Sequence, residues 1–263
     1  MSYLSMSALT CLYKDKYIYA VHKPQEVPFH SLDETLQKDQ GPIHVEGIVS
    51  LTRKFLDDDN IYPVHRLDRM TSGVMIFART KEVNSTLSKL FLEKKIEKYY
   101  LALSENKPKK KQGAVIGDME KGRSGSYLLK RTNGNPAITR FFAKKITNNE
   151  CAAWFYMLKP ETGKTHQLRV ALKSLGSPIL GDSRYSGKPA SRGYLHAYKV
   201  RFELLGNRYE IVDLNFKGDE FDFEQFCSSV LNDTDSLNSS ISAILKPELL
   251  PWPKPSFLVS ENN

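Results

Sequence analysis

The chain has 263 residues, 40% of them hydrophobic, and its 38 Lys and Arg against 30 Asp and Glu give a net charge of +8 at pH 7. This hydrophobic content supports a folded core and excludes both a wholly disordered chain and a coiled-coil rod. No run of about 18 apolar residues predicts a membrane span, residues 1–13 lack the features of a secretory signal, and three widely spaced cysteines favour a reducing cytoplasm over a disulfide framework or a zinc cluster.

Strands dominate the predicted secondary structure. Apolar residues alternate around a charged turn at Asp15-Lys16, which predicts two short strands within residues 11–22, and Lys23-Pro24 is expected to break the run. A polar turn is expected over residues 66–73. Further strands are predicted at residues 74–77, 98–103, 113–160 and 195–214, with turns at Asn133-Gly134 and Gly206-Asn207.

Helices are few in this pattern. Apolar residues at helical spacing predict helices over residues 81–95 and 166–175, and a weaker pattern predicts one near residues 48–56. Another short helix is expected near residues 223–231, before a Ser-, Asn- and Pro-rich end. The balance predicts an α+β fold with a mostly antiparallel sheet.

The charge is unevenly divided along the chain. Residues 219–263 hold eight acidic residues and two lysines, so residues 1–218 carry a strong positive excess. A basic body with an acidic tail indicates a polyanionic partner, most simply nucleic acid, and the alternative is a basic protein with ordinary solvated faces.

Two common kinds of site are excluded by spacing. Gly163-Lys164-Thr165 resembles the end of a phosphate-binding loop, but Leu158 stands where that loop requires a glycine. The six histidines show no metal-ligand spacing, so no metal site is expected.

Three polar segments beside apolar runs remain as candidates. Asp68 lies between two arginines, where it caps a turn or carries chemistry. Arg169 begins an apolar helical pattern, where a charge needs a partner, so a structural salt bridge is the alternative to a functional role. Of Tyr99 and Tyr100 on one predicted strand, one is expected in the core.

These segments together resemble the RluA-type RNA pseudouridine synthases. The sequence HRLDRMTSG at residues 65–73 matches that family's catalytic motif HRLDxxTSG, and PETGKTHQLRVALKSLGSPILGD at residues 160–182 matches its second long motif. The segment KYY at residues 98–100 fits its K-x-Y element. Shorter matches are AVHKP at residues 20–24, with His30, and LHA at residues 195–197; Gln25-Glu26 departs from the family's small residue and glycine.

The resemblance implies a catalytic domain over residues 11–218 with that family's mixed, mostly antiparallel sheet and few flanking helices. It implies a stand-alone enzyme without an S4-type module, followed by an acidic, Ser- and Pro-rich tail over residues 219–263 that is partly disordered or packed as an extension. The implied activity is isomerisation of uridine to pseudouridine in structured RNA, ribosomal or transfer, by a cytoplasmic monomer. No cofactor, metal, membrane or obligatory protein partner is implied.

The same resemblance assigns roles to residues. Asp68 is implied as the carboxylate that acts on the ribose, because a carboxylate suits a developing sugar cation. Arg169 is implied as its guanidinium partner, so we expect a direct ion pair between them. Tyr100 is implied as the tyrosine that stacks on uracil and assists proton transfer.

RNA contacts are also implied. Arg66 is expected to fill the stack that a flipped uridine leaves, Leu168 to line the uracil pocket, and His65 and Lys164 to contact RNA. Further phosphate contacts are expected from basic side chains. These are Lys109, Lys110, Lys111, Lys121, Arg123, Lys130 and Arg131.

Two other functions compete with isomerisation. One is a catalytically silent RNA-binding or RNA-chaperone protein on the same fold, which would not need Asp68, Tyr100 and Arg169 together. The other is an N-glycosidase that releases uracil, since the same carboxylate could begin that reaction.

Overall fold

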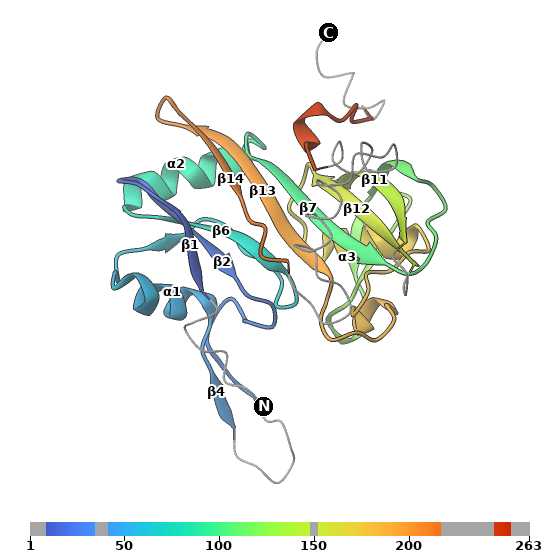
Figure 1. Ribbon diagram of the computed structural model, residues 1–263, viewed down its shortest axis with the longest axis horizontal. Coiled ribbons are helices and arrows are strands. Elements are labelled where there is room, and N and C mark those ends of the chain that lie inside the picture. The colour runs from blue at the N-terminus through green and yellow to red at the C-terminus, as the bar shows by residue number, and fades with distance from the viewer. Residues whose placement is uncertain (1–8, 35–41, 148–151, 217–244, 254–263) are drawn as a thin grey trace. The chain divides into compact units, whose positions relative to one another are not determined.

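The computed structural model describes residues 9–34, 42–147, 152–216 and 245–253 (Figure 1). The chain divides into two compact units. The first comprises the residues up to Glu97 together with His196–Phe216, and the second comprises Lys98–Leu195 with the described C-terminal residues. No helix in these ranges is both long and apolar enough to span a membrane.

The first unit is built on a sheet in the order β1-β2-β6-β13, with β14 paired to β13 and β5 paired to β6. All of these pairs are antiparallel except β6 with β13, which is parallel. The strands are β1 (Thr10–Lys14), β2 (Ile18–Lys23), β5 (Tyr62–Pro63), β6 (Ser72–Ala78), β13 (Leu195–Leu204) and β14 (Asn207–Val212).

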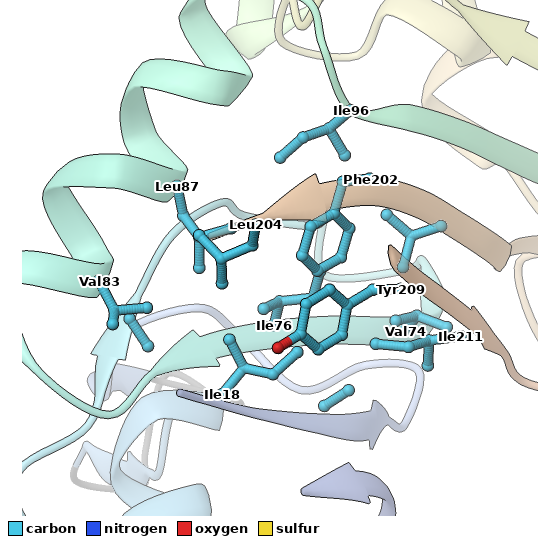
Figure 2. Close-up of a cluster of buried hydrophobic side chains, with 13 residues drawn as sticks. Ile18, Val74, Ile76, Val83, Leu87, Ile96, Phe202, Leu204, Tyr209 and Ile211 are labelled. Carbon is cyan, nitrogen blue, oxygen red and sulfur yellow. The ribbon is translucent and has the colours of Figure 1, made fainter. Parts of the chain in front are cut away.

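Helices α1 (Ile48–Leu56) and α2 (Lys81–Leu92) cover opposite faces of this sheet. Side chains alternate between the faces of a strand, so Ile76 of β6 packs in the α2 cluster while Phe77 packs in the α1 cluster. Figure 2 shows the α2 cluster, where Val83 and Leu87 of the helix approach Ile76. Buried on both faces, β6 is apolar along most of its length.

A separate two-stranded ribbon, β3 (Leu32–Glu34) with β4 (Ile43–Val45), precedes α1. The ribbon is exposed, and each strand has only three residues. Three residues are too few to establish a period-two pattern, so the sequence does not predict this ribbon.

The second unit contains the antiparallel strand order β7-β12-β11-β8 and a small hairpin, β9 with β10. Helix α3 (Gln167–Ser174) buries Leu168, Val170, Ala171 and Leu172. The strands are β7 (Glu97–Ser104), β8 (Gln112–Gly117), β9 (Met119–Lys121), β10 (Tyr127–Leu129), β11 (Ala137–Thr147) and β12 (Ala152–Pro160), and short 3-10 helices occur at Arg123–Gly125, Ser183–Tyr185 and Pro247–Leu249.

The described C-terminal residues pack onto this second unit. The Trp252 ring meets Phe142 of β11 edge-on, with centroids 5.0 Å apart, and lies 6.0 Å from the ring of Tyr99 on β7. The indole N–H donates to the carbonyl oxygen of Pro247 at 2.6 Å. The helix predicted near residues 223–231 lies outside the described residues.

The predicted α+β class with mostly antiparallel strands is confirmed, as are the two strands around Asp15-Lys16, the three main helices and the strand pair around Gly206-Asn207. The predicted break at Lys23-Pro24 is confirmed, because β2 ends at the buried Lys23 and Pro24 lies outside the strand. No two-residue hairpin forms at Asn133-Gly134; instead the Asp118 carboxylate accepts the N–H groups of Gly134 (2.9 Å) and Asn135 (2.7 Å).

Gly73 joins the Asp68 loop to β6 at a point where a side chain has no room. Its φ is +116°, and a Cβ there would lie 2.3 Å from the carbonyl oxygen of Ala197 on β13. Gly206, at the β13–β14 turn, has a φ of +78° and open space around it. A side chain at either position would require a positive φ, but only a side chain at Gly73 would also clash with neighbouring backbone. Comparing the two positions therefore distinguishes the cost of the clash from the cost of the backbone conformation.

We predict that Gly73→Ala lowers the free energy of unfolding by at least about 3 kcal/mol, because backbone must shift as well as adopt a strained φ. Gly206→Ala is the control and should cost only about 1–2 kcal/mol. Denaturant unfolding of both variants tests this, and equal losses would contradict the clash.

Candidate active site

The loop that carries Asp68 is held from inside the first unit by a lysine. The Lys23 side chain is fully buried, and its ammonium donates hydrogen bonds to the carbonyl oxygens of Pro24 (2.8 Å), Arg69 (3.0 Å) and Thr71 (2.9 Å). The Thr71 N–H closes the turn by donating to the Asp68 carbonyl at 3.0 Å. Asp68 itself is half-buried. The loop backbone is therefore fixed while the carboxylate stays partly accessible.

Arg69 fastens the outer side of the same loop. Its Nε donates to the Glu26 carbonyl oxygen at 3.1 Å, and its guanidinium pairs with the Glu34 carboxylate through both Nη atoms, Nη2 at 3.3 Å. This ties the Asp68 loop to the β3–β4 ribbon. Arg66, two residues before Asp68, is exposed and lies over the Phe29 ring at 5.6 Å.

Behind the loop runs a buried polar chain. The Ser72 hydroxyl contacts His196 Nδ1 at 2.8 Å, and His196 Nε2 contacts the backbone oxygen of Asp213 at 2.9 Å. The Asp213 carboxylate contacts His22 Nδ1 at 2.6 Å. These four residues connect β6, β13, β2 and the segment after β14, so the strand that follows Asp68 is fixed by polar contacts as well as by apolar packing.

Burial alone would raise the pKa of Asp213, but the hydrogen bond to His22 and the positive field of His196 and His22 outweigh it, and the pKa is lowered. The backbone N–H of Asn215 also donates to this carboxylate, at 2.9 Å. The ionised form of Asp213 therefore stabilises the fold.

His65 takes part in the fold of the first unit. Its Nε2 accepts the backbone N–H of Ile76 at 3.0 Å, and its ring stacks on Phe91 with centroids 5.1 Å apart. One nitrogen and one face of the imidazole are thereby engaged within the protein. An RNA contact by His65 stays a prediction.

In the second unit, Arg169 forms a two-point ion pair with Asp182. Arg169 Nε meets Asp182 Oδ2 at 2.7 Å, and Nη2 meets Oδ1 at 2.7 Å. The two side chains are only 8% and 1% exposed. The Arg169 guanidinium also lies 4.9 Å from the centroid of the Tyr185 ring. A guanidinium in an apolar helix needs a charged partner, and Asp182 supplies it.

The start of α3 is fixed by Gln167. Its amide group donates to the Ile138 carbonyl oxygen (2.9 Å) and the Thr139 hydroxyl (3.0 Å), and its Oε1 accepts the Lys164 N–H at 3.0 Å. The Lys164 ammonium donates to Asn135 Oδ1 at 2.8 Å. Leu168 is buried, at 7% exposure. A pocket-lining role for Leu168 stays a prediction.

On β7, one of the two tyrosines lies in the core, as predicted. Tyr99 is buried and Tyr100 is half-buried, paired in register with Leu158 of β12. Lys98 shares the Tyr100 face of the strand. Burial lowers the pKa of Lys98, and the nearby charge of Glu161 only partly opposes this. Tyr100 thus has an amine with a lowered pKa two residues away on the same face of the strand.

The structure thus places Asp68, Arg66 and His65 in the first unit, and Tyr100, Lys164, Leu168 and Arg169 in the second. The predicted ion pair between Asp68 and Arg169 stays a prediction. Within the described ranges, no three His, Cys, Asp or Glu side chains gather as metal ligands.

Sequence reasoning missed the supporting residues Lys23, His196, Asp213 and Asp182. All four are polar yet buried. The available signal was their place beside apolar runs: Lys23 ends an apolar strand, and Asp182 follows Gly181 at the end of a long motif. Their partners lie elsewhere in the chain, so the pairing needed the fold.

Comparison with known proteins places these features in context. Residues 17–174 match the family model described as RNA pseudouridylate synthase. An uncharacterized RNA pseudouridine synthase of Haemophilus influenzae is 47% identical over 70% of this chain and 80% of that protein. A protein of Rickettsia bellii named ribosomal large subunit pseudouridine synthase C is 34% identical over 72% of this chain and 62% of that protein.

A solved structure supports the fold. Human RNA Pseudouridylate Synthase Domain Containing 1 superposes with a TM-score of 0.69 at 21% identity, covering 97% of this chain and all of that one.

We predict that Lys23→Met lowers the free energy of unfolding by about 3 kcal/mol or more, because three buried carbonyl groups lose their donor. Lys14→Met, at an exposed lysine of the neighbouring strand, is the matched control and should change it by less than about 0.5 kcal/mol. Urea unfolding measures both. A Lys23→Met protein as stable as the control variant would show that the three hydrogen bonds do not hold the loop.

The lowered pKa of Asp213 predicts a pH dependence of stability. An aspartate whose folded pKa lies below its unfolded value, about 3.9, adds stability above that pH and loses it as the pH falls toward the folded value. Asp213→Asn should therefore be less stable than the parent at pH 6, and the difference should shrink below about pH 4.

Asp33 provides the control, because it contacts His44 at 2.9 Å while both side chains are more than 60% exposed. Asp33→Asn should leave the melting temperature unchanged at every pH. Thermal melts from pH 6 to pH 3 test both variants, and a parent–Asp213→Asn difference that stays constant over this range would refute the argument.

Proposed function

Because the chain belongs to the RNA pseudouridylate synthase family, we propose that it isomerises specific uridines of a structured RNA to pseudouridine, with Asp68 as the carboxylate that acts on the ribose. In this reaction the bond from N1 of uracil to C1′ of the ribose breaks, the base turns, and C5 bonds to C1′. The C5 proton is lost and N1 gains a proton, so the product has the atoms of the substrate. The chemistry requires neither an oxidant nor a cofactor.

The single observation that carries the assignment is the way the Asp68 loop is built. Lys23 binds carbonyl oxygens on the C-terminal side of Asp68, and Arg69 ties the loop to the ribbon. A carboxylate that must meet C1′ in one geometry gains from such preorganisation, since a small displacement of a reacting group is costly in rate. Half-burial leaves it accessible to a substrate.

We expect the guanidinium of Arg169 to pair with Asp68 in the reaction and to keep the carboxylate ionised and oriented. Tyr100 would lie against the uracil, where its ring stacks and its hydroxyl moves the C5 proton. Lys98, on the same face of β7 with a lowered pKa, could share that proton with Tyr100.

We propose that Arg66 assists base flipping by filling the position that the uridine leaves in the stack. A stacked uridine must leave the helix before its C1′ can meet Asp68, at a cost of a few kcal/mol. Arg66 is exposed, and its only described ring partner, Phe29, holds it by a contact worth about 1 kcal/mol at such a site. Moving from Phe29 into the vacated stack is therefore energetically accessible.

The basic residues of the second unit support an RNA partner. All seven expected phosphate contacts are exposed, and the β9–β10 hairpin carries or flanks several of them. Ribosomal RNA and transfer RNA both remain candidate substrates. The name of the Rickettsia relative makes large-subunit ribosomal RNA the first substrate to test. We propose that the chain acts in the cytoplasm, as a monomer.

We predict that Asp68→Asn abolishes isomerisation, with a loss of several orders of magnitude in rate, while folding and RNA affinity stay nearly intact. A neutral amide keeps the shape but is a poor nucleophile and cannot balance a sugar cation. Asp33→Asn, at an exposed carboxylate of the same unit, should retain full activity. The measurement is pseudouridine mapping in RNA from cells that lack the gene, after incubation with each protein.

Turnover by Asp68→Asn within tenfold of the parent, free of contaminating enzyme, would remove Asp68 from the mechanism. Loss of uracil from the RNA instead of isomerisation would identify an N-glycosidase. RNA binding by the parent without any change in the RNA would favour the silent binding protein.

A further inference from the structure

The orientation of Arg169 is set outside its own helix. Asp182 accepts from Nε and Nη2, two donors on one edge of the guanidinium, at 2.7 Å each. Two parallel bonds to one carboxylate fix the plane of the guanidinium as well as its position. The Tyr185 ring, 4.9 Å from the guanidinium carbon and 1% exposed, supports it further.

The loop that carries these two partners is itself fixed. The Asp182 N–H donates to the Ile179 carbonyl oxygen at 3.0 Å, and the Asp182 carbonyl oxygen accepts the Gly187 N–H at 2.8 Å. Gly181 has a φ of +80°, and a Cβ there would lie 1.7 Å from the carbonyl oxygen of Arg192. The Asp182 backbone is therefore hydrogen-bonded through both its N–H and its carbonyl oxygen, beside a glycine that packs directly against Arg192.

Tyr185 is anchored at its far end. Its hydroxyl accepts the backbone N–H of Tyr127 at 2.9 Å and contacts His166 Nδ1 at 2.9 Å. His166 is the residue immediately before α3 and has a left-handed φ of 56°. The ring that supports Arg169 is therefore connected both to β10 and to the start of the helix that carries Arg169.

We infer that Asp182 is a positioning residue for the isomerisation, which holds the Arg169 guanidinium in the orientation in which it serves Asp68. The inference rests on the proposed function and assigns a role that sequence motifs did not. A fold-stabilising role alone explains the geometry poorly, since a buried ion pair adds little net stability over apolar packing of the same volume. A fixed guanidinium plane is an advantage if Arg169 must also pair with a second carboxylate, that of Asp68.

The test compares rates of the parent and variants under single turnover. The substrate is total RNA from cells that lack the gene, labelled with tritium at C5 of uracil, because isomerisation releases that tritium. Asp182→Asn keeps the shape but points an amide N–H₂ at a guanidinium donor. We expect its rate to fall about 10- to 100-fold, with RNA affinity within about threefold of the parent.

Two further variants distinguish a loss of Arg169 positioning from a general loss of stability. Tyr156→Phe removes a buried hydroxyl that donates to Ser177 at 2.5 Å in the same unit, and should lower the melting temperature without lowering the rate. Arg169→Lys should be slower than the parent by about 100-fold, since an ammonium cannot form the two-point contact. The double variant Asp182→Asn with Arg169→Lys should be no more than about threefold slower than Arg169→Lys alone, because the two changes remove the same Arg169–Asp182 interaction.

Additive losses in the double variant, or an Asp182→Asn rate within threefold of the parent, would overturn the inference while leaving the proposed function standing. A parent protein that releases no tritium would instead defeat the proposed function and this inference with it.

If Asp182→Asn does not fold, the parent still decides the matter. The Arg169 Nε–H, identified by its loss in Arg169→Lys, should exchange with solvent far more slowly than exposed arginines do. Exchange as fast as theirs would show that Asp182 does not hold it.

Discussion

The buried ammonium of Lys23 is the constraint on which the Asp68 loop depends. An ammonium carries three donors and no acceptor, and away from water each donor needs an oxygen atom. Pro24, Arg69 and Thr71 supply three carbonyl oxygens, and these can converge only if the chain turns sharply between them. The need to satisfy one charge therefore shapes the backbone around Asp68.

The two units use buried polarity in the same way. Apolar side chains on both faces of β2 and β6 supply the hydrophobic core of the first unit, whereas hydrogen-bonded polar groups define where the loops lie. In the second unit Gln167 joins α3 to β11, and Asp182 joins α3 to the loop after it. The Asp68 loop is thus held by Lys23, and the Arg169 guanidinium is held by Asp182.

How much of the fold and of the candidate site can be predicted from sequence depends on how far apart in the chain the interacting residues lie. Period-two alternation located β2, an unbroken apolar run located residues 74–77 of β6, and period 3.6 located α2 and α3, because those patterns are local. Motifs located Asp68 and Arg169. The buried state of Lys23 could not be predicted, since its partners lie up to 48 residues away. The Asp182 partnership likewise required knowing that the loop after α3 folds back on the helix.

Packing of Trp252 against Tyr99 and Phe142 has a consequence for spectroscopy. The chain has two tryptophans, Trp154 on β12 and Trp252, and both belong to the second unit. Intrinsic indole emission therefore reports the second unit alone, whereas far-ultraviolet circular dichroism reports both. Denaturation curves from the two signals would superimpose if the units unfold together and separate if the Asp68-bearing unit opens independently.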